Sequence, residues 1–254
     1  MDQGLFLVDA VSHSGPPDII AIRARSADLA GDLRTRREGS WKNATLRTIV
    51  TEIAGRNQLT PLIADTLASL TLPALIQSRE SDLALLKRLG KEQDAVATIK
   101  GGALIFAPIG SGMTASGAAI PPATITRRDG DRHSYSIEKQ EESTGIEASW
   151  HDLKSGKKKR LIAGEKGKVR RLSRTYSSEQ AARAAVRAEQ GRKSRLPERL
   201  SFDLALGRPD LYPERKITAK GFKPEIDAGK WLIASVSHRL GSGGFTSSLD
   251  MEIS

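Results

Sequence analysis

The sequence contains no cysteine, which excludes disulfide bonds, thiolate catalysis and cysteine-ligated zinc. Aromatic residues make up only 4 % of the chain, so a core has to rest on Leu, Ile, Val and Ala. No apolar run approaches the roughly 18 residues that cross a membrane, and the N-terminal segment has neither the basic nor the apolar region of a secretion signal. We therefore expect no membrane association, and these absences fit a protein of the cytosol.

Charge is abundant but local. The 254 residues include 40 Lys and Arg against 30 Asp and Glu, a net charge of +10. Residues 154–195, called the basic strip below, hold fifteen basic and three acidic residues, a net charge of +12 that leaves −2 for the rest of the chain. Such a strip can bind phosphates, but proteins that bind single strands usually add stacking aromatics, and only Tyr176 lies inside it. A solvated surface is favoured first, an acidic protein partner second and nucleic acid least.

The first half of the chain reads as mixed α and β. Residues 44–56 repeat apolar side chains at helical spacing, with Asn43 as the expected N-cap, and a second helix is expected over 81–89 with Gly90 as its end. Strands are expected at 5–11, 18–25, 95–100 and 103–107, the last two joined by Gly101-Gly102 in a tight hairpin.

The second half is more strand-like. Residues 107–122 carry no charge and are rich in small residues and proline, which indicates a linker or extended loop. One helix is expected over 178–190, begun by a Ser177–Gln180 capping box and ended by Gly191. Alternating segments predict a half-buried antiparallel sheet or a barrel, with strands at 133–139, 145–151, 157–163, 169–173, 200–206, 231–240 and 245–253.

None of the candidate catalytic and cofactor motifs has the residues that its chemistry requires. Gly110-x-Gly112-x-x-Ala115 has the spacing of a dinucleotide fingerprint, but Gly117 and the prolines after it prevent the helix whose N-terminus would hold the pyrophosphate. The chain has no Gly-x-Ser-x-Gly motif, and the adjacent Glu141 and Glu142 would point to opposite faces of a strand. The four histidines, His13, His133, His151 and His238, lack metal-ligand spacing. We expect no enzyme activity, no cofactor and no metal.

Three ordered blocks resemble the phage late control D family, the hub proteins of contractile phage tails. The longest block is Trp231–Leu240 with Gly244–Thr246 after it, preceded by residues 206–209 and 221–224. A second block runs from Gln77 through Asp82 to Leu89 and on to residues 103–106, and a third joins residues 15–18, 40–41 and 45–50. Together the blocks span nearly the whole chain in the order of the family.

The resemblance implies a non-catalytic structural protein of the virion, made in the cytoplasm of the bacterial host. Such hubs form homotrimers in which each subunit offers two similar β-barrels, so that a pseudo-sixfold ring joins the tail tube protein to the tail spike protein. Related barrels lie at the base of type VI secretion spikes. Family members carry further residues ahead of the block at residue 5, so the first barrel is expected to be incomplete here, with unpaired strand edges near residues 5–25.

Taken together, the sequence predicts a β-dominated α+β fold with tail-hub barrels and a small α/β insert. We expect a remnant of the first barrel at 1–38, the insert at 39–107, a linker at 108–120 and the second barrel at 121–254. The basic strip is expected to be solvated or to face a protein partner, and the alternative function is a regulator that binds nucleic acid through residues 154–195. The residues expected at this surface are Lys157, Lys158, Lys159, Arg160, Arg170 and Arg171.

Overall fold

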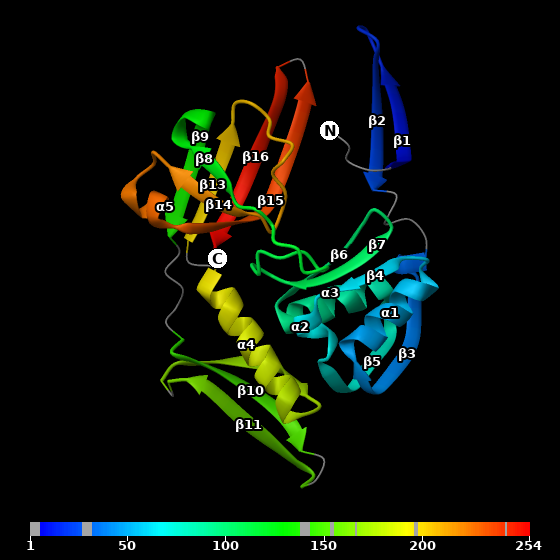
Figure 1. The fold of residues 1–254 in the computed structure, drawn as a ribbon. Coiled ribbons are helices and arrows are strands. Elements are labelled where there is room, and N and C mark those ends of the chain that lie inside the picture. Colours follow the sequence, from blue (N-terminus) through cyan, green and yellow to red (C-terminus); the bar gives the residue numbers. More distant parts are fainter. Residues whose placement is uncertain are drawn as a thin grey trace. The chain divides into compact units, whose positions relative to one another are not determined.

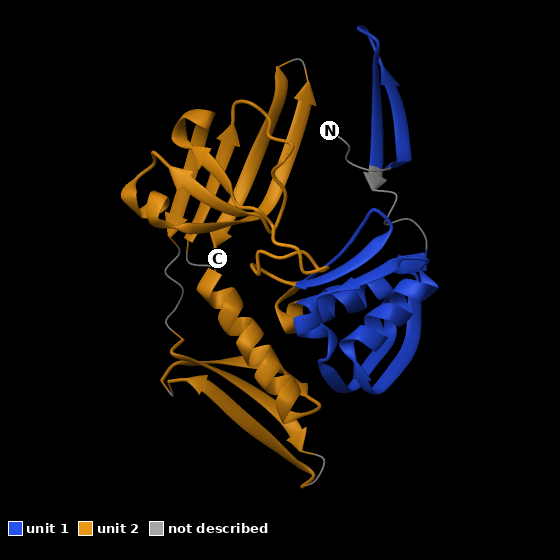
Figure 2. Ribbon diagram, in the orientation of Figure 1, with its two compact units in different colours: residues 1–90, 96–107 blue, residues 91–95, 108–254 orange. Residues whose placement is uncertain are grey.

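The computed structural model describes residues 6–26, 32–137, 143–152, 155–165, 167–195, 198–241 and 243–254, and most of its elements are strands. The chain divides into two compact units, residues 1–90 with 96–107 and residues 91–95 with 108–254 (Figure 2). The predicted fold class, α+β with a dominance of β-structure, is confirmed.

The first unit begins with a hairpin. Strands β1 (Phe6–Ser14) and β2 (Ile19–Ser26) pair antiparallel, as the two apolar segments around Gly15-Pro16-Pro17 predict (Figure 1). Within the described residues these two strands form a sheet of their own. A two-stranded sheet is marginal in water by itself, so the hairpin needs cover from elsewhere.

The rest of the first unit is the α/β part, which holds more strands than the sequence indicates. β3 pairs with β5, and β7 lies between β4, which is parallel to it, and β6. Residues 38 and 39, where a domain boundary is expected, both lie within β3. The elements are η2 (Asp32–Arg34), β3 (Arg36–Thr45), α1 (Leu46–Arg56), β4 (Thr60–Ile63), α2 (Asp65–Ala68), β5 (Thr71–Ser81), α3 (Asp82–Gln93), β6 (Ala95–Lys100) and β7 (Ala103–Pro108).

Both predicted helices exist here; the first ends at Arg56 as expected, but its N-cap and the end of the second helix were predicted wrongly. The N-cap of α1 is Thr45, whose Oγ1 accepts the Thr48 N–H at 3.2 Å, because Asn43 still belongs to β3. Helix α3 runs through Gly90, since a glycine ends a helix only where the backbone turns left-handed. Asp94 makes that turn, with a φ of 52°.

The second unit contains a six-stranded sheet in the order β8-β14-β15-β16-β13-β9. The two outermost strands are consecutive in the chain and only η3 separates them, so the sheet must curl until its two edges meet at that corner (Figure 1). Gly130 lies in the corner because a Cβ there would meet the Asp203 carbonyl oxygen at 2.0 Å. The elements are β8 (Ala123–Thr126), η3 (Arg127–Asp129), β9 (Gly130–Ile137), β13 (Glu198–Leu204), β14 (Lys216–Lys220), α5 (Pro224–Ala228), β15 (Lys230–Gly241) and β16 (Gly244–Ile253).

The curled sheet encloses the main core of this unit. Side chains alternate inward along β13 and β16, as their period-2 patterns predict. Trp231 is fully buried and its Nε1–H donates to the Ile226 carbonyl oxygen at 2.8 Å. The core side chains that are at most 1 % exposed are Ile125, Leu200, Phe202, Leu211, Ile226, Trp231, Ile233 and Leu249.

A smaller sheet is inserted between two neighbouring strands of the curled sheet. β9 and β13 pair antiparallel from Ile137 opposite Glu198 onward, and the second sheet and its helix lie between these two strands in the sequence. Its order is β11-β10-β12. Its elements are β10 (Gly145–Asp152), β11 (Lys157–Gly164), β12 (Val169–Tyr176) and α4 (Glu179–Arg195).

Helix α4 is longer than the sequence predicts. It continues through Gly191 to Arg195. Its first turn is capped by Ser178, whose Oγ accepts the Ala181 N–H at 3.2 Å, and not by the expected Ser177. The expected end was wrong for the reason that applies to α3: Gly191 does not have a positive φ.

Candidate partner interface

The basic strip is built on the three-stranded sheet and on α4, which covers one face of it (Figure 1). Successive side chains of a strand point to opposite faces, so β10 sends Ile146, Ala148 and Trp150 toward the helix. Ala182 and Val186 of α4 meet them, and the small alanines let helix and sheet approach closely. The opposite face of the sheet, called the open face below, receives Glu147, Ser149 and His151 of β10.

The structure divides the six predicted residues between the two faces. Lys158 and Arg160 pair in register with His151 and Ser149, so they lie on the open face, and Arg171 pairs with Glu147 there. Lys157 and Lys159 stand opposite Asp152 and Trp150, on the helix side, and Arg170 stands opposite Ile146. One continuous surface of all six residues is therefore not formed.

The residues on the helix side are largely neutralised. Lys159 Nζ lies 2.5 Å from Asp152 Oδ2, and Arg170 Nη2 lies 3.0 Å from Glu189 Oε1. Burial acts to raise the pKa of Glu189, but the hydrogen bond from Arg192 and the charge of Arg170 outweigh it and lower that pKa overall. Arg170 thus joins β12 to α4 and Lys159 joins β11 to β10, and both cations have less charge left for a partner.

The open face keeps a positive balance. Glu147 Oε1 lies between two arginines, 3.8 Å from Arg160 Nε and 3.4 Å from Arg171 Nε. Lys158 makes no ion pair with any described residue, so three cations face one acid. Lys154 and Lys166 of the strip fall outside the described residues. A polar, cationic face of this kind gives a docking partner orientation and specificity more than affinity.

A second surface, missed by the sequence analysis, lies on the β1–β2 hairpin. A bulge between Val8 and Ala10 shifts the phase of β1, so that Val8 and Val11 fall on one face together with Ile22 of β2. Phe6 and Ile20 share that face, and these five side chains are 54–68 % exposed. The signal was present in the three isoleucines of β2, but an unshifted alternation along β1 hides the common face. We call this surface the apolar hairpin face.

The glycine-rich segment that was rejected as a dinucleotide motif has a structural role. Residues 109–122 form no helix, and the Gly110 N–H donates at 2.7 Å to Glu214 Oε2, so a carboxylate of the chain occupies the donor that a pyrophosphate would need. Burial raises the pKa of Glu214, and this hydrogen bond offsets part of the rise. Glu141 and Glu142 lie outside the described residues.

One pair of side chains resembles the start of a catalytic dyad. His238 Nδ1 lies 2.7 Å from Ser247 Oγ. Ser247 is only 1 % exposed, and its Oγ also accepts the Arg208 N–H at 3.0 Å. The pair therefore ties the loop before Arg208 to the curled sheet, and a buried hydroxyl offers no substrate access. Across the part of the chain that is described, no cluster of three or more His, Asp or Glu could hold a metal.

The described helices are all too short or too polar to cross a bilayer. What the molecule offers instead are two unlike surfaces, one cationic and one apolar, on a sheet-dominated fold.

Several solved structures that share this architecture are tail proteins. The tail protein from Neisseria meningitidis MC58 superposes with a TM-score of 0.73 at 14 % identity, covering 97 % of this chain and 79 % of that one. The 43 kDa tail protein of prophage MuSo2 from Shewanella oneidensis gives 0.67 at 16 % identity, covering 96 % and 77 %. A type VI secretion component of Escherichia coli gives 0.54 at 14 % identity, covering 98 % and 60 %. These likenesses show that the chain has the fold of these tail and secretion-system proteins.

Sequence comparison narrows the class. The profile of the phage tail baseplate hub (GPD) matches residues 8–244. The probable baseplate hub proteins of Escherichia phages 186 and P2 are 37 % and 38 % identical over 100 % and 99 % of this chain, which cover 76 % and 75 % of their own lengths. The chain belongs to the phage tail baseplate hub family, and its role is that of a structural tail component.

Proposed function

We propose that this chain acts as a baseplate hub that joins the tail tube to the central spike as a homotrimer. The match along nearly the whole chain to two hub proteins carries the proposal. A trimer in which each subunit contributes two barrel-like parts can meet a sixfold tube on one side and a threefold spike on the other. In this chain the curled sheet would be one of these parts and the β1–β2 hairpin a portion of the other. The chain performs no chemistry in this role and is packaged in the virion after assembly in the host cytoplasm.

The apolar hairpin face could supply binding free energy in such an assembly, and the cationic open face could select the partner. The apolar hairpin face requires cover, and burying it supplies binding free energy at roughly 25 cal/mol per Å² of apolar surface removed from water. The open face of the three-stranded sheet, with Lys158, Arg160 and Arg171 around Glu147, suits an acidic surface of a tail partner. We assign recognition of the tail partner to this open face.

The test is co-expression of the full chain with the spike protein and, separately, with the tube protein of the same tail. Light scattering should give three times the 27.4 kDa mass of the chain and co-elution with the spike. Charge reversal at Lys158 and Arg160 should weaken association by about tenfold at low salt. Reversal at the exposed Lys220 and Lys223 is the matched control, because it changes the net charge equally and lies off the strip. A monomer that ignores both partners would refute the proposal.

The alternative function, nucleic-acid binding through the basic strip, finds less support. Lys159 and Arg170 are held in intramolecular ion pairs, and Glu147 lies among the cations of the open face. Duplex DNA binding measured against salt decides between the two. Sub-micromolar affinity at physiological salt, abolished by neutralising the six strip residues, would favour the regulator.

A further inference from the structure

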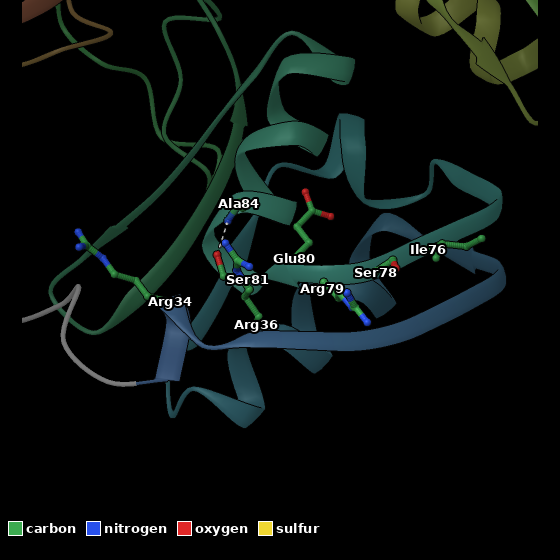
Figure 3. A pocket seen from close by; sticks show the side chains of 8 residues that line it. All are labelled: Arg34, Arg36, Ile76, Ser78, Arg79, Glu80, Ser81 and Ala84. Atoms are coloured by element: carbon green, nitrogen blue, oxygen red, sulfur yellow. Dashed lines mark hydrogen bonds between the residues drawn. The ribbon is translucent and has the colours of Figure 1, made fainter.

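A cleft of about 550 Å³ opens beside the sheet of β3 and β5 in the first unit (Figure 3). Its lining includes Arg34 from η2, Arg36 from the start of β3 and Arg79 from β5, together with Ser81 and the apolar Ile76. The basic strip does not contribute to it. The cleft is therefore a separate basic site, hidden in a part of the chain whose overall charge is close to neutral.

The backbone places two of the arginines at the cleft. Arg36 pairs in register with Ser81, which brings the guanidinium-bearing residue of β3 beside the hydroxyl of β5. The register between β3 and β5 then shifts, so that Ser78 and Arg79 form a bulge. Arg79 has a φ of 47°, a left-handed conformation that an arginine adopts at a cost. The bulge thus places a third cation in the lining of the cleft.

The described residues do not balance the charges of the cleft. Among the described residues, Arg34, Arg36 and Arg79 make no ion pair. Glu80, the acid in the lining, is already held by Arg88, with nitrogen–oxygen distances of 3.1 and 2.7 Å.

The neighbouring Arg37 shows the opposite arrangement. It lies next to Arg36 in β3 but faces the other way, where Asp32 and the buried Asp82 lie 3.0 and 3.7 Å from it. Arg37 therefore has acidic partners, whereas the three arginines of the cleft form no ion pair with a described residue. A cluster of guanidinium groups without acids is a ready-made carboxylate site, because each planar fork can hold a carboxylate with two hydrogen bonds.

The other residues that line the cleft restrict the class of ligand it can bind. Ile76 is 66 % exposed and stands at the opposite end of the cleft from Arg34 (Figure 3). No aromatic side chain lines the cleft, so nothing is present on which a nucleic-acid base could stack. We infer that the cleft binds an acidic peptide segment of a partner protein, with its carboxylates on Arg34, Arg36 and Arg79 and an apolar side chain on Ile76. This inference does not depend on the trimer or on the tube and spike.

The test measures fluorescence anisotropy of a labelled glutamate-rich peptide carrying one leucine, titrated with the full chain. Arg79→Gly is the main variant, because glycine accepts the left-handed backbone without strain while the guanidinium is lost. It should bind about tenfold more weakly and unfold at the same or a higher urea concentration. Arg47→Gln removes one charge from the same unit away from the cleft and should leave binding unchanged.

A second pair of variants tests the apolar end. Ile76→Ser should weaken binding of the leucine-containing peptide several-fold, and should not alter binding of a peptide in which serine replaces the leucine. Arg36→Gln repeats the charge test on the other strand. Equal weakening by Arg47→Gln and Arg79→Gly would overturn the inference. So would a duplex DNA probe that binds as tightly as the peptide and loses affinity in Arg36→Gln and Arg79→Gly, because it would show a nucleic-acid site.

Discussion

The curled six-stranded sheet and the β1–β2 hairpin both have an apolar face, but that face is buried in the sheet and exposed in the hairpin. In the sheet, the inward side chains of β13, β15 and β16 are covered by the same chain, and Trp231 and Ile233 are fully buried. In the hairpin, Val11 and Ile22 are 65 % and 66 % exposed although they also share one face. The pattern of a strand therefore specifies which face is apolar, but only the rest of the fold decides whether its own chain or another molecule covers that face.

The difference separates stability from assembly. Residues of the curled sheet hold the unit together, whereas residues of the apolar hairpin face contribute little to folding and are available for contacts with other molecules. Substitutions at matched positions in the two regions should therefore affect different measurements.

The largest effect is expected for Trp231→Ala. The change removes a fully buried ring from the core and leaves the Ile226 carbonyl oxygen without its 2.8 Å donor. It should lower the free energy of unfolding by about 3–5 kcal/mol, measured by urea denaturation. Leu240→Ala on the same strand, at a residue 81 % exposed, is the control and should change it by no more than about 0.5 kcal/mol. Similar losses in both variants would erase the distinction between covered and uncovered residues.

A smaller, pH-dependent effect is expected for Glu214→Gln, at the turn before β14. Burial raises the pKa of Glu214 in the folded state above its value in the unfolded chain. The folded state thus holds this proton more tightly, and stability is lost as the pH rises through the folded pKa. Glutamine cannot ionise and keeps an oxygen for the Gly110 N–H. Urea midpoints between pH 4 and pH 7 should favour the variant increasingly as the pH rises, and a gap that narrows would contradict the assignment.

The smallest effect on stability is expected for Ile22→Ser on the apolar hairpin face. Since the side chain is 66 % exposed, the free energy of unfolding should change by about 0.5 kcal/mol or less. Association with other chains, followed by light scattering against concentration, should nevertheless weaken. The equivalent change at the buried Ile233 should destabilise the fold severely. If Ile22→Ser unfolds the protein as well, the hairpin is covered by its own chain.

Much of the fold could be predicted because apolar periodicity reports burial directly. It located the buried faces of α1, β13 and β16, and Gly101-Gly102 marked the hairpin of β6 and β7. Periodicity failed for β3, a polar strand in which Trp41 is the one buried residue and whose partner β5 comes later in the chain. Helix ends at Gly90 and Gly191 were misplaced because composition does not reveal the sign of φ.

The site was predictable as a region but not as a surface. The charge count located the strip, yet the acids that neutralise Lys159 and Arg170 come from β10 and α4 and reach them only after pairing and packing. The bulge beside Val8 changes which residues share a face, and no local pattern marks it. The cleft was not predicted, because the residues outside the basic strip have a net charge near zero and a net charge does not show which cations lack acidic partners.

The insertion of the three-stranded sheet has an evolutionary consequence. The chain leaves the curled sheet after Ile137 and re-enters it at Glu198, and these two residues face each other across neighbouring strands. A segment whose ends lie side by side can be lengthened, replaced or reduced to a short turn with little disturbance to the strands that hold it. We therefore expect the cationic sheet and α4 to vary more among related tails than the curled sheet does, which would let a tail change its partner without changing the sheet that carries the segment.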